Sequence, residues 1–393
     1  MCIDIEIPIP ALSVIERLEG FGYEAFAVGG CVRDSILGRK PNDWDVTTSA
    51  RPDDVLKIFD AAGFKAVATG IEHGTVTVIC ENEPIEVTTY RLDGDYIDCR
   101  HPESVSFTSS IEDDLARRDF TVNAIAYSNR RGIVDPYGGQ KDIADSIIRC
   151  VGEPERRFRE DALRILRALR FSSVLGFEIF PDTAKAAVEL SGLVDRVSRE
   201  RVYSELSKLI CGKNAARVIE LYRSVIESVM PISDCCEAVK RLGDVNENRD
   251  TALMYSVLLF GHDSESILRG LKADKKTILR VKSILSESHA EDRIDAKLLC
   301  SRVGIDIARE IQLLAFAFGR IEYEGVEFID RIIENHECVS VKQLKINGGD
   351  LILTGIEPVR IGDALNSLLR EVIKGNIPNE RSSLIETAAR KYL

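Results

Sequence analysis

The chain has 393 residues, of which 45% are hydrophobic and 30% charged; this is enough for two or more globular domains, and no apolar run approaches the roughly 20 residues that span a bilayer. Ten scattered cysteines without CxxC spacing and an acidic N-terminus indicate no zinc site, disulfide framework or secretory signal, so we expect a cytoplasmic protein without a membrane partner. The net charge of −12 argues against general coating of nucleic acid, because phosphates are neutralised by lysine and arginine.

The first elements lead into a pair of glycines. A helix is expected over 11–19, and the apolar run 25–28 predicts a short strand that ends directly at Gly29-Gly30. Because glycine has no Cβ, the backbone of such a turn can approach another group closely. The turn continues as Cys31-Val32-Arg33-Asp34. This junction is therefore a candidate cradle for a triphosphate.

Two aspartates, Asp43 and Asp45, follow nine residues later, where we expect a strand over 44–48. Side chains one residue apart on a strand project to the same face. Carboxylates held side by side repel each other, and a hard divalent cation such as Mg²⁺ relieves that repulsion. Asp43 and Asp45 are therefore the predicted catalytic metal ligands, which would serve transfer of a nucleotide. The structural alternative is a turn or helix-cap pair.

The rest of the first 150 residues is also mixed α/β. A helix is expected over 52–62, and β-rich runs over 75–79 and 85–90 are separated by turn residues. Glu86 on the second run is the candidate third metal carboxylate, and the equally weighted alternative is an exposed strand residue. The polar, aperiodic stretch 92–108 predicts a long loop, which in a compact domain is usually functional or disordered.

The block Arg117-Arg118-Asp119-Phe120-Thr121-Val122-Asn123-Ala124 comes next. Asp119 can accept hydrogen bonds from ribose hydroxyls, and Arg118 can grip phosphate oxygens in bidentate fashion. The alternative is a capping and ion-pairing cluster at the start of a helix. Amphipathic helical patterns then dominate from about residue 150 to the end, with breaks near 212–214, 261–263 and 347–349.

The first helical segment carries six arginines from Arg156 to Arg170, which predicts a local basic stripe. Within it, Asp161 and Arg164 are i and i+3 and would be neighbours on a helix surface. A carboxylate acceptor beside a guanidinium donor matches the Watson–Crick edge of cytosine or adenine, whereas uracil and guanine present the opposite polarity. The pair is thus a candidate for choosing C and A without a template; the alternative is a surface salt bridge.

The segment GGCVRDSILGRKPNDWD, residues 29–45, resembles the head motif of the nucleotidyltransferase superfamily that includes DNA polymerase beta. Its spacing is similar to that of class II CCA-adding enzymes and bacterial poly(A) polymerases. The blocks at 117–124 and 160–170, and Ser198-Arg199-Glu200-Arg201-Val202, resemble further motifs of that family in matching order. The resemblance covers residues 1 to about 210. The segment 344–351 resembles the tail of the family less closely.

The resemblance implies an α+β protein, with a small mixed sheet in an N-terminal nucleotidyltransferase head followed by an elongated all-α part. The expected domains are a catalytic head over 1–150, a neck for base recognition over 151–211, a body over 212–335 and a tRNA-binding tail over 336–393. The implied metal ligands are Asp43, Asp45 and Glu86. The implied nucleotide-binding residues are Gly29, Gly30, Arg33, Arg118, Asp119, Asn123, Asp161, Arg164 and Arg167.

The implied activity is template-independent addition of C, C and A to the 3′ end of tRNA from CTP and ATP, with Mg²⁺ as cofactor. The tRNA acceptor arm and 3′ end are the expected partner. CC-only, A-only and poly(A) addition stay open; the loop after Tyr90 has its full length, which favours complete addition over CC-only. That loop has one arginine at Arg100-His101-Pro102, where relatives carry consecutive arginines. A non-catalytic RNA-binding module and a nucleotide hydrolase are the alternatives outside this chemistry.

Overall fold

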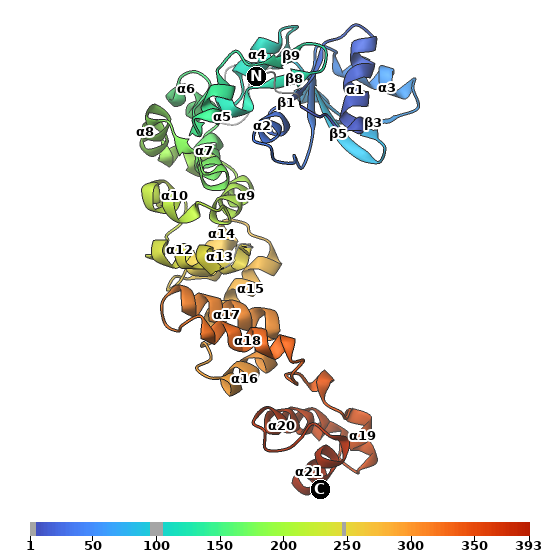
Figure 1. The fold of residues 1–393 in the computed structure, drawn as a ribbon, viewed down its shortest axis with the longest axis vertical. Coiled ribbons are helices and arrows are strands. Elements are labelled where there is room, and N and C mark those ends of the chain that lie inside the picture. Colours follow the sequence, from blue (N-terminus) through green and yellow to red (C-terminus); the bar gives the residue numbers. More distant parts are fainter. Residues whose placement is uncertain (1–4, 95–104, 246–248) are drawn as a thin grey trace. The chain divides into compact units, whose positions relative to one another are not determined.

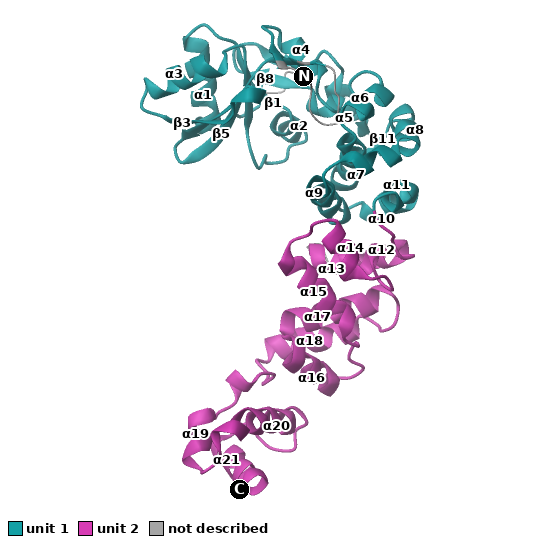
Figure 2. Cartoon of the chain, turned by 180° about the vertical axis from the view of Figure 1, so that it is seen from behind, with its two compact units in different colours: residues 1–229 teal, residues 230–393 magenta. Residues whose placement is uncertain are grey.

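The protein is described here by a computed structural model that covers residues 5–94, 105–245 and 249–393 (Figure 1). The chain forms two compact units, residues 1–229 and 230–393 (Figure 2). A mixed sheet lies in the first unit and the second unit is helical, which confirms the predicted α+β class. Among the described residues, no helix is long and apolar enough to cross a membrane.

One seven-stranded sheet organises the N-terminal part. β2 and β5 pair in parallel and their neighbours pair antiparallel, so the sheet is mixed. In spatial order its strands are β3 (Lys65–Gly70), β4 (Thr75–Cys80), β5 (Glu83–Thr89), β2 (Asp45–Thr48), β1 (Ala25–Val28), β8 (Ala126–Ser128) and β9 (Gly132–Val134).

Helices cover the two faces of this sheet unequally. α1 (Ile9–Gly20) and α3 (Pro52–Asp60) pack on one face, where the apolar side chains of β4 and β5 are buried (Figure 1). On the other face, Ile111 and Leu115 of α4 (Ile111–Ala116) pack against Phe26 and Val28 of β1. Because successive side chains of a strand point to opposite faces of the sheet, every second residue of β4 and β5 faces a helix and is buried.

The predicted strands and helices of this part are present within two or three residues, and three differences stand out. The sequence did not predict β3, β8 or β9, because β8 and β9 have three residues each and β3 shows no alternation of buried and exposed side chains. The expected turn at 81–84 is two residues long, since Glu81 and Asn82 alone have positive φ and β5 begins at Glu83. The expected loop 92–108 is wrong at its ends, where β6 (Arg91–Asp93) pairs with β7 (Val105–Phe107). Its Arg100-His101-Pro102 lies outside the described residues.

Helices complete the first unit after a turn in which both Asp135 carboxylate oxygens accept backbone N–H bonds from Gly139 and Gln140. α7 (Leu163–Leu175) is buried over most of its surface and packs against α9 (Arg199–Ile210). A short parallel pair joins β10 (Ile147–Ile148), which precedes α7, to β11 (Glu178–Ile179), which follows it. The other helices of this part are α5 (Gly139–Ala144), α6 (Pro154–Glu160), α8 (Pro181–Glu189), α10 (Ala215–Leu221) and α11 (Arg223–Glu227), and α2 (Gly30–Ile36) follows β1 earlier in the chain.

The second unit contains two groups of helices. The break expected near 261–263 falls between two helices. The break expected near 347–349 is the start of α19, which Asn347 caps by accepting the Gly349 and Asp350 N–H groups. The first group is α12 (Cys236–Val245), α13 (Thr251–Leu258), α14 (Ser264–Gly270), α15 (Lys275–Ser286), α16 (Arg293–Val303), α17 (Ile305–Ala317) and α18 (Glu324–Glu334). α19 (Gly348–Leu353), α20 (Ile361–Ile373) and α21 (Arg381–Tyr392) share a separate apolar core.

Candidate active site

Three carboxylates meet on one face of the sheet. Asp45 is the first residue of β2 and lies opposite Glu86 of β5 in the parallel register, so their side chains project to the same face. Asp43 precedes the strand by two residues. Restricted hydration, together with the charges of Asp43 and Glu86, raises the pKa of Asp45 to about 6 against the opposing charge of Arg118. The fold therefore holds these three acids close enough to repel.

These acids do not form a closed cage. Among the residues that the structure describes, no group of three His, Cys, Asp or Glu side chains is arranged to hold a metal ion by itself. Mg²⁺ is usually bound by one or two carboxylates together with substrate phosphates and water. The all-oxygen donor set and the mutual repulsion of these acids fit such a cation, which Asp43 and Asp45 could hold with Glu86 beside them.

The glycine pair lies next to the acids. Gly29 follows β1 with φ 83°, and its N–H donates to the Ile125 carbonyl at 3.0 Å. A Cβ at Gly29 would lie 2.9 Å from Nη1 of Arg118, and the Arg118 charge also acts on Asp45. Gly30 is the first residue of α2, so the predicted turn passes at once into a helix. The structure thus brings Gly29, Arg118 and Asp45 together.

Arg118 is held by a residue that the sequence did not single out. Asp114 is fully buried and accepts bonds from Arg117 at 2.7 Å and from Thr47 at 3.1 Å. Nη2 of Arg118 lies 3.5 Å from the same carboxylate, and its Nε is buried without a hydrogen-bond partner. Arg118 therefore keeps unused donors, which suit a phosphate group. The signal in the sequence was an acid one helical turn before two arginines.

Asp119 is part of a buried network rather than an open acceptor. One oxygen accepts from Phe120 N at 2.8 Å and from Asn123 Nδ2 at 3.0 Å, and the other accepts from Arg167 Nε at 2.8 Å. Although burial alone would raise the pKa of Asp119, the Arg167 charge and the Asn123 bond lower it to about 2. Arg33 joins the network through a 2.6 Å bond to Asn123 Oδ1. A ribose hydroxyl would therefore have to share Asp119 with protein donors.

The prediction that Asp161 and Arg164 are neighbours on one helix is wrong. α6 ends at Glu160, Asp161 is extended with φ −140° and ψ 102°, and α7 begins at Leu163. The reason is local capping, because an Asp161 oxygen accepts the Leu163 N–H at 3.1 Å. The second oxygen accepts from Arg201 Nη2 at 2.9 Å.

Arg164 is buried and has different partners. It donates to Glu160 at 3.0 Å and to the Arg117 carbonyl at 3.0 Å. Asp161 and Arg164 thus lie at one helix junction, each fixed by a residue other than its proposed partner. Arg201, from the expected motif at 198–202, is the residue that orients Asp161. A mutual salt bridge, the structural alternative, is replaced by these contacts.

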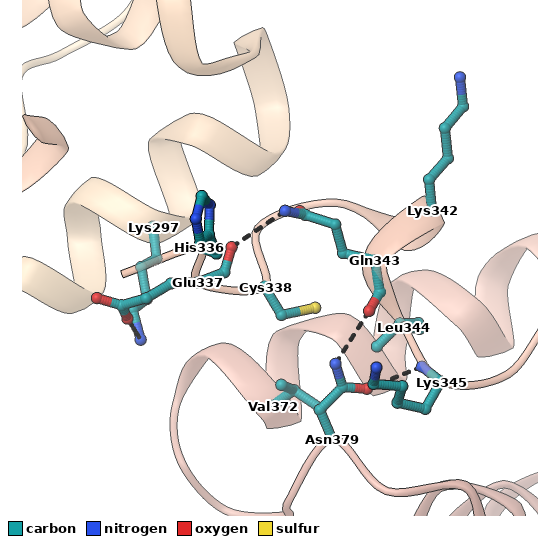
Figure 3. Close-up of a pocket in the computed structure, with 10 residues that line it drawn as sticks. All are labelled: Lys297, His336, Glu337, Cys338, Lys342, Gln343, Leu344, Lys345, Val372 and Asn379. Carbon is teal, nitrogen blue, oxygen red and sulfur yellow. Dashed lines mark hydrogen bonds and ion pairs between the residues drawn. The ribbon is translucent and has the colours of Figure 1, made fainter. Parts of the chain in front are cut away.

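The second unit contains a basic pocket, shown in Figure 3. Lys297 pairs with Glu337, whereas Lys342 and Lys345 lie in no ion pair with any described residue. Asn379 accepts the Lys345 N–H at 2.9 Å and thereby joins the two sides of the pocket. The pocket is lined by Lys297, His336, Glu337, Cys338, Lys342, Gln343, Leu344, Lys345, Val372 and Asn379. It includes the start of the segment 344–351 that we expect to contact tRNA.

A mixed sheet with acids on adjacent strands, followed by helices, defines the polymerase head class, and comparison with known families agrees. The family described as "Poly A polymerase head domain" matches residues 25–149. "Probable RNA and SrmB- binding site of polymerase A" matches 176–225, and "tRNA nucleotidyltransferase domain 2 putative" matches 244–388. The chain is therefore a nucleotidyltransferase, and enzymes of this class are generally metal-dependent.

Full-length relatives narrow the class. The CCA-adding enzyme of Geobacillus stearothermophilus is 37% identical, with 95% of each chain covered, and that of Ligilactobacillus salivarius is 36% identical over 96% of this chain and 95% of its own. The crystal structure of the Bacillus stearothermophilus CCA-adding enzyme in complex with CTP has a TM-score of 0.79 at 32% identity, covering 98% of both chains. The chain belongs to the family of CCA-adding enzymes.

A more distant structure shares the fold. The Thermotoga maritima CCA-adding enzyme complexed with tRNA-CCA has a TM-score of 0.68 at 22% identity, covering 96% of this chain and 94% of its own.

Proposed function

We propose that the protein adds C, C and A to the 3′ end of tRNA, using CTP and ATP and releasing pyrophosphate. The observation that carries this proposal is the register of Asp45 against Glu86, with Asp43 two residues away, beside the Gly29 turn. Full-length relatives are named for the same activity. A non-catalytic RNA-binding module has no use for three repelling acids beside a glycine turn.

The chain's own residues divide the work. Asp43 and Asp45, with Glu86 beside them, would hold Mg²⁺. The bound cation would activate the attacking hydroxyl and neutralise the charge of the displaced pyrophosphate. Gly29, Gly30 and Arg118 hold the triphosphate, because backbone without a Cβ and an arginine with unused donors meet there. The tRNA 3′ oxygen attacks the α-phosphorus in line, and the bond from that phosphorus to the pyrophosphate oxygen breaks.

Base selection is assigned to the junction of α6 and α7. Asp161 offers a carboxylate oriented by Arg201, and Arg164 offers a guanidinium held by Glu160. The carboxylate acceptor and the guanidinium donor together match the Watson–Crick edges of C and A. They face groups of the same hydrogen-bonding kind on U and G. Arg33, Asn123, Asp119 and Arg167 form the supporting network that joins the head to α7.

The remaining assignments follow from the same proposal. The head would span 1–150, the neck 151–211, the body 212–335 and the tail 336–393, with Lys342 and Lys345 toward the acceptor arm of tRNA. Buried unbridged thiols such as Cys31 and Cys150 favour a reducing compartment, and we place the reaction in the cytoplasm.

The direct test supplies labelled CTP, ATP or both to the purified protein with tRNA that lacks its 3′ end. Three added nucleotides, in the order C, C and A, are expected with both substrates, and two with CTP alone. Arrest after two nucleotides with both substrates identifies CC-only addition. Incorporation of ATP alone identifies A-only addition or, if products lengthen without limit, poly(A) synthesis. Release of nucleotide without RNA extension identifies a hydrolase and contradicts the proposal.

A further inference from the structure

The sheet face that carries the acids is covered on one side only. On β1, Phe26 and Val28 of this face are buried beneath α4. On β5, β4 and β3, the side chains of the same face remain accessible among the described residues: Glu86 and Val67 are exposed and Thr77 is half-buried. On β4 and β5 the side chains of the opposite face are buried beneath α1 and α3. An accessible half-face therefore adjoins the acids.

The register defines which residues form this half-face. Across the sheet, Val67 pairs with Thr77, Thr77 with Glu86, and Glu86 with Asp45. Every second residue along each strand shares the face. The β3 register shifts between Val67 and Gly70, and Thr69 belongs to this face through its hydrogen bond to Thr77. We name this surface the threonine face; it consists of Lys65, Val67, Thr69, Thr75, Thr77, Ile79, Glu86 and Thr88.

The other side of the acids already has an assigned occupant. Gly29 follows β1, Asn123 precedes β8, and the Arg118 guanidinium lies over Gly29. The groups that suit a triphosphate thus lie on the β1–β8 side of Asp45. In-line displacement requires the attacking and departing oxygens on opposite sides of the phosphorus. The second substrate therefore approaches from the β5 side, where Glu86 begins the threonine face.

We infer that the threonine face binds the 3′-terminal nucleotides of the RNA acceptor through their ribose and phosphate groups. This inference rests on the proposed function and assigns its second substrate a place. Thr69 and Thr77 share a hydrogen bond of 2.8 Å, and Thr75 and Thr88 share one of 3.2 Å. Each pair uses one hydroxyl hydrogen, which leaves the second as a donor for ribose or phosphate oxygens.

Lys65 supplies the only cation of this face. It is exposed at the start of β3, two residues from Val67 on the same face, and forms no ion pair with any described residue. Hydroxyls and one lysine contact sugar and phosphate without reading base edges. Such a surface accepts successive 3′ ends that differ in sequence, as an acceptor that gains C, C and A requires.

Three single variants test the inference. Thr77→Val removes one hydroxyl at a strand position that favours β-branched residues, Thr77→Ser retains it, and Lys65→Gln removes the charge. Lys57→Gln on α3 is the matched control, because it is an exposed lysine on the helix that covers the opposite face.

Steady-state kinetics should separate the two substrates. For Thr77→Val and Lys65→Gln we expect the KM for acceptor RNA to rise roughly 3- to 15-fold, as for loss of one hydrogen bond or one phosphate contact. The KM for CTP should stay within twofold, and Thr77→Ser and Lys57→Gln should resemble the unaltered protein. An unchanged KM for RNA in both test variants, or an equal rise for CTP, overturns the inference.

A binding experiment on the unaltered protein is independent of which nucleotides are added. An acceptor-stem RNA with a photoreactive nucleotide at its 3′ end should cross-link to residues 65–79 or 86–88. Cross-links confined to other segments overturn the inference even if C, C and A are added normally. If cross-links form at 65–79 or 86–88 but no CCA is added, the proposed function fails while the RNA path stands.

Discussion

At the scale of single residues, the site depends on charges that are close and incompletely balanced. Asp45 has two acidic neighbours and one cation, whereas Asp119 has neutral N–H donors on one oxygen and the Arg167 cation on the other. The pKa of Asp45 is therefore raised and that of Asp119 lowered, although both are aspartates in one small domain. The opposite pKa shifts distinguish Asp45, whose charge is not balanced by the protein, from Asp119, whose charge is balanced by protein donors.

Asp45→Ala should reduce nucleotide incorporation by a factor of about 10³ or more, because one cation ligand is lost where charge develops in the transition state. The affinity for tRNA should change less than threefold, since Asp45 contributes no positive charge to RNA binding. Single-turnover incorporation and filter binding measure the two quantities. Asp53→Asn on α3 is the control. Retained turnover in Asp45→Ala would remove the metal assignment.

The pKa of Asp45 near 6 predicts a pH-dependent requirement for Mg²⁺. Protons compete with the cation for this carboxylate, so the Mg²⁺ concentration for half-maximal rate should rise about tenfold per pH unit below pH 6. Without metal, the raised pKa means that the folded state binds this proton more tightly than the unfolded state, so stability is lost as pH rises from about 4 to 6. Activity titrations between pH 5 and 8 provide the check; a constant Mg²⁺ requirement contradicts the assignment.

If Asp161 reads the base as proposed, Asp161→Ala should impair nucleotide choice more than rate, because it removes the proposed hydrogen-bond acceptor and leaves the three acids of the sheet intact. We expect discrimination against UTP and GTP to fall roughly 10-fold or more, the scale of one lost polar contact to a charged group. Competition assays with all four nucleotides measure this ratio. Unchanged exclusion of UTP and GTP would count against selection by the protein.

At the scale of elements, helix ends decide the geometry of the neck. α6 and α7 meet at Asp161 and are not continuous, and the arginines of α7 point into contacts with the head and with α9. Arg167 donates to Asp119 and also lies 3.7 Å from Glu205 of α9. Burial of nearly all sides of α7 makes its packing against α9 the structural core of this region.

Gly212→Ala should destabilise the protein by about 2 kcal/mol, the cost of an added methyl group in a tightly packed site. The new Cβ would lie 2.2 Å from Ser173 Oγ and 2.8 Å from the Ser173 backbone of α7, and backbone cannot move aside cheaply. Gly192→Ala is the matched control, because no atom lies within 4 Å of its Cβ position. Denaturant unfolding compares the stability of the two variants. Equal unfolding midpoints would contradict the prediction and show that the backbone near Ser173 moves at little cost.

At the scale of the whole molecule, the predicted catalytic residues and the basic pocket lie in different compact units. Every predicted catalytic or nucleotide-binding residue lies within 1–229, and Lys342 and Lys345 lie within 230–393. A net charge of −12 coexists with these local basic sites, because affinity for nucleic acid depends on the charges at the contact.

Removal of residues 230–393 should therefore separate the two functions. The Kd for CTP should stay within about threefold, and the Kd for tRNA should rise about tenfold or more through loss of phosphate contacts. Calorimetry and filter binding measure these constants, with circular dichroism to establish folding of the shortened chain. Loss of CTP binding by a folded fragment would place part of the nucleotide site in the second unit.

The sequence by itself determined the identity of the acids, the glycine turn and the helical character after residue 150, because side-chain period and absent Cβ atoms are local properties. For Glu86 it left two readings open, a third metal carboxylate and an exposed strand residue. The tertiary structure shows Glu86 exposed and, through the strand register, opposite Asp45; a role in metal binding stays a prediction. The tertiary structure likewise decided the distant partners of two aspartates: Arg201 donates to Asp161, and Arg167 donates to Asp119. These contacts join residues 40 and 48 positions apart in the chain, and no local pattern encodes such pairs.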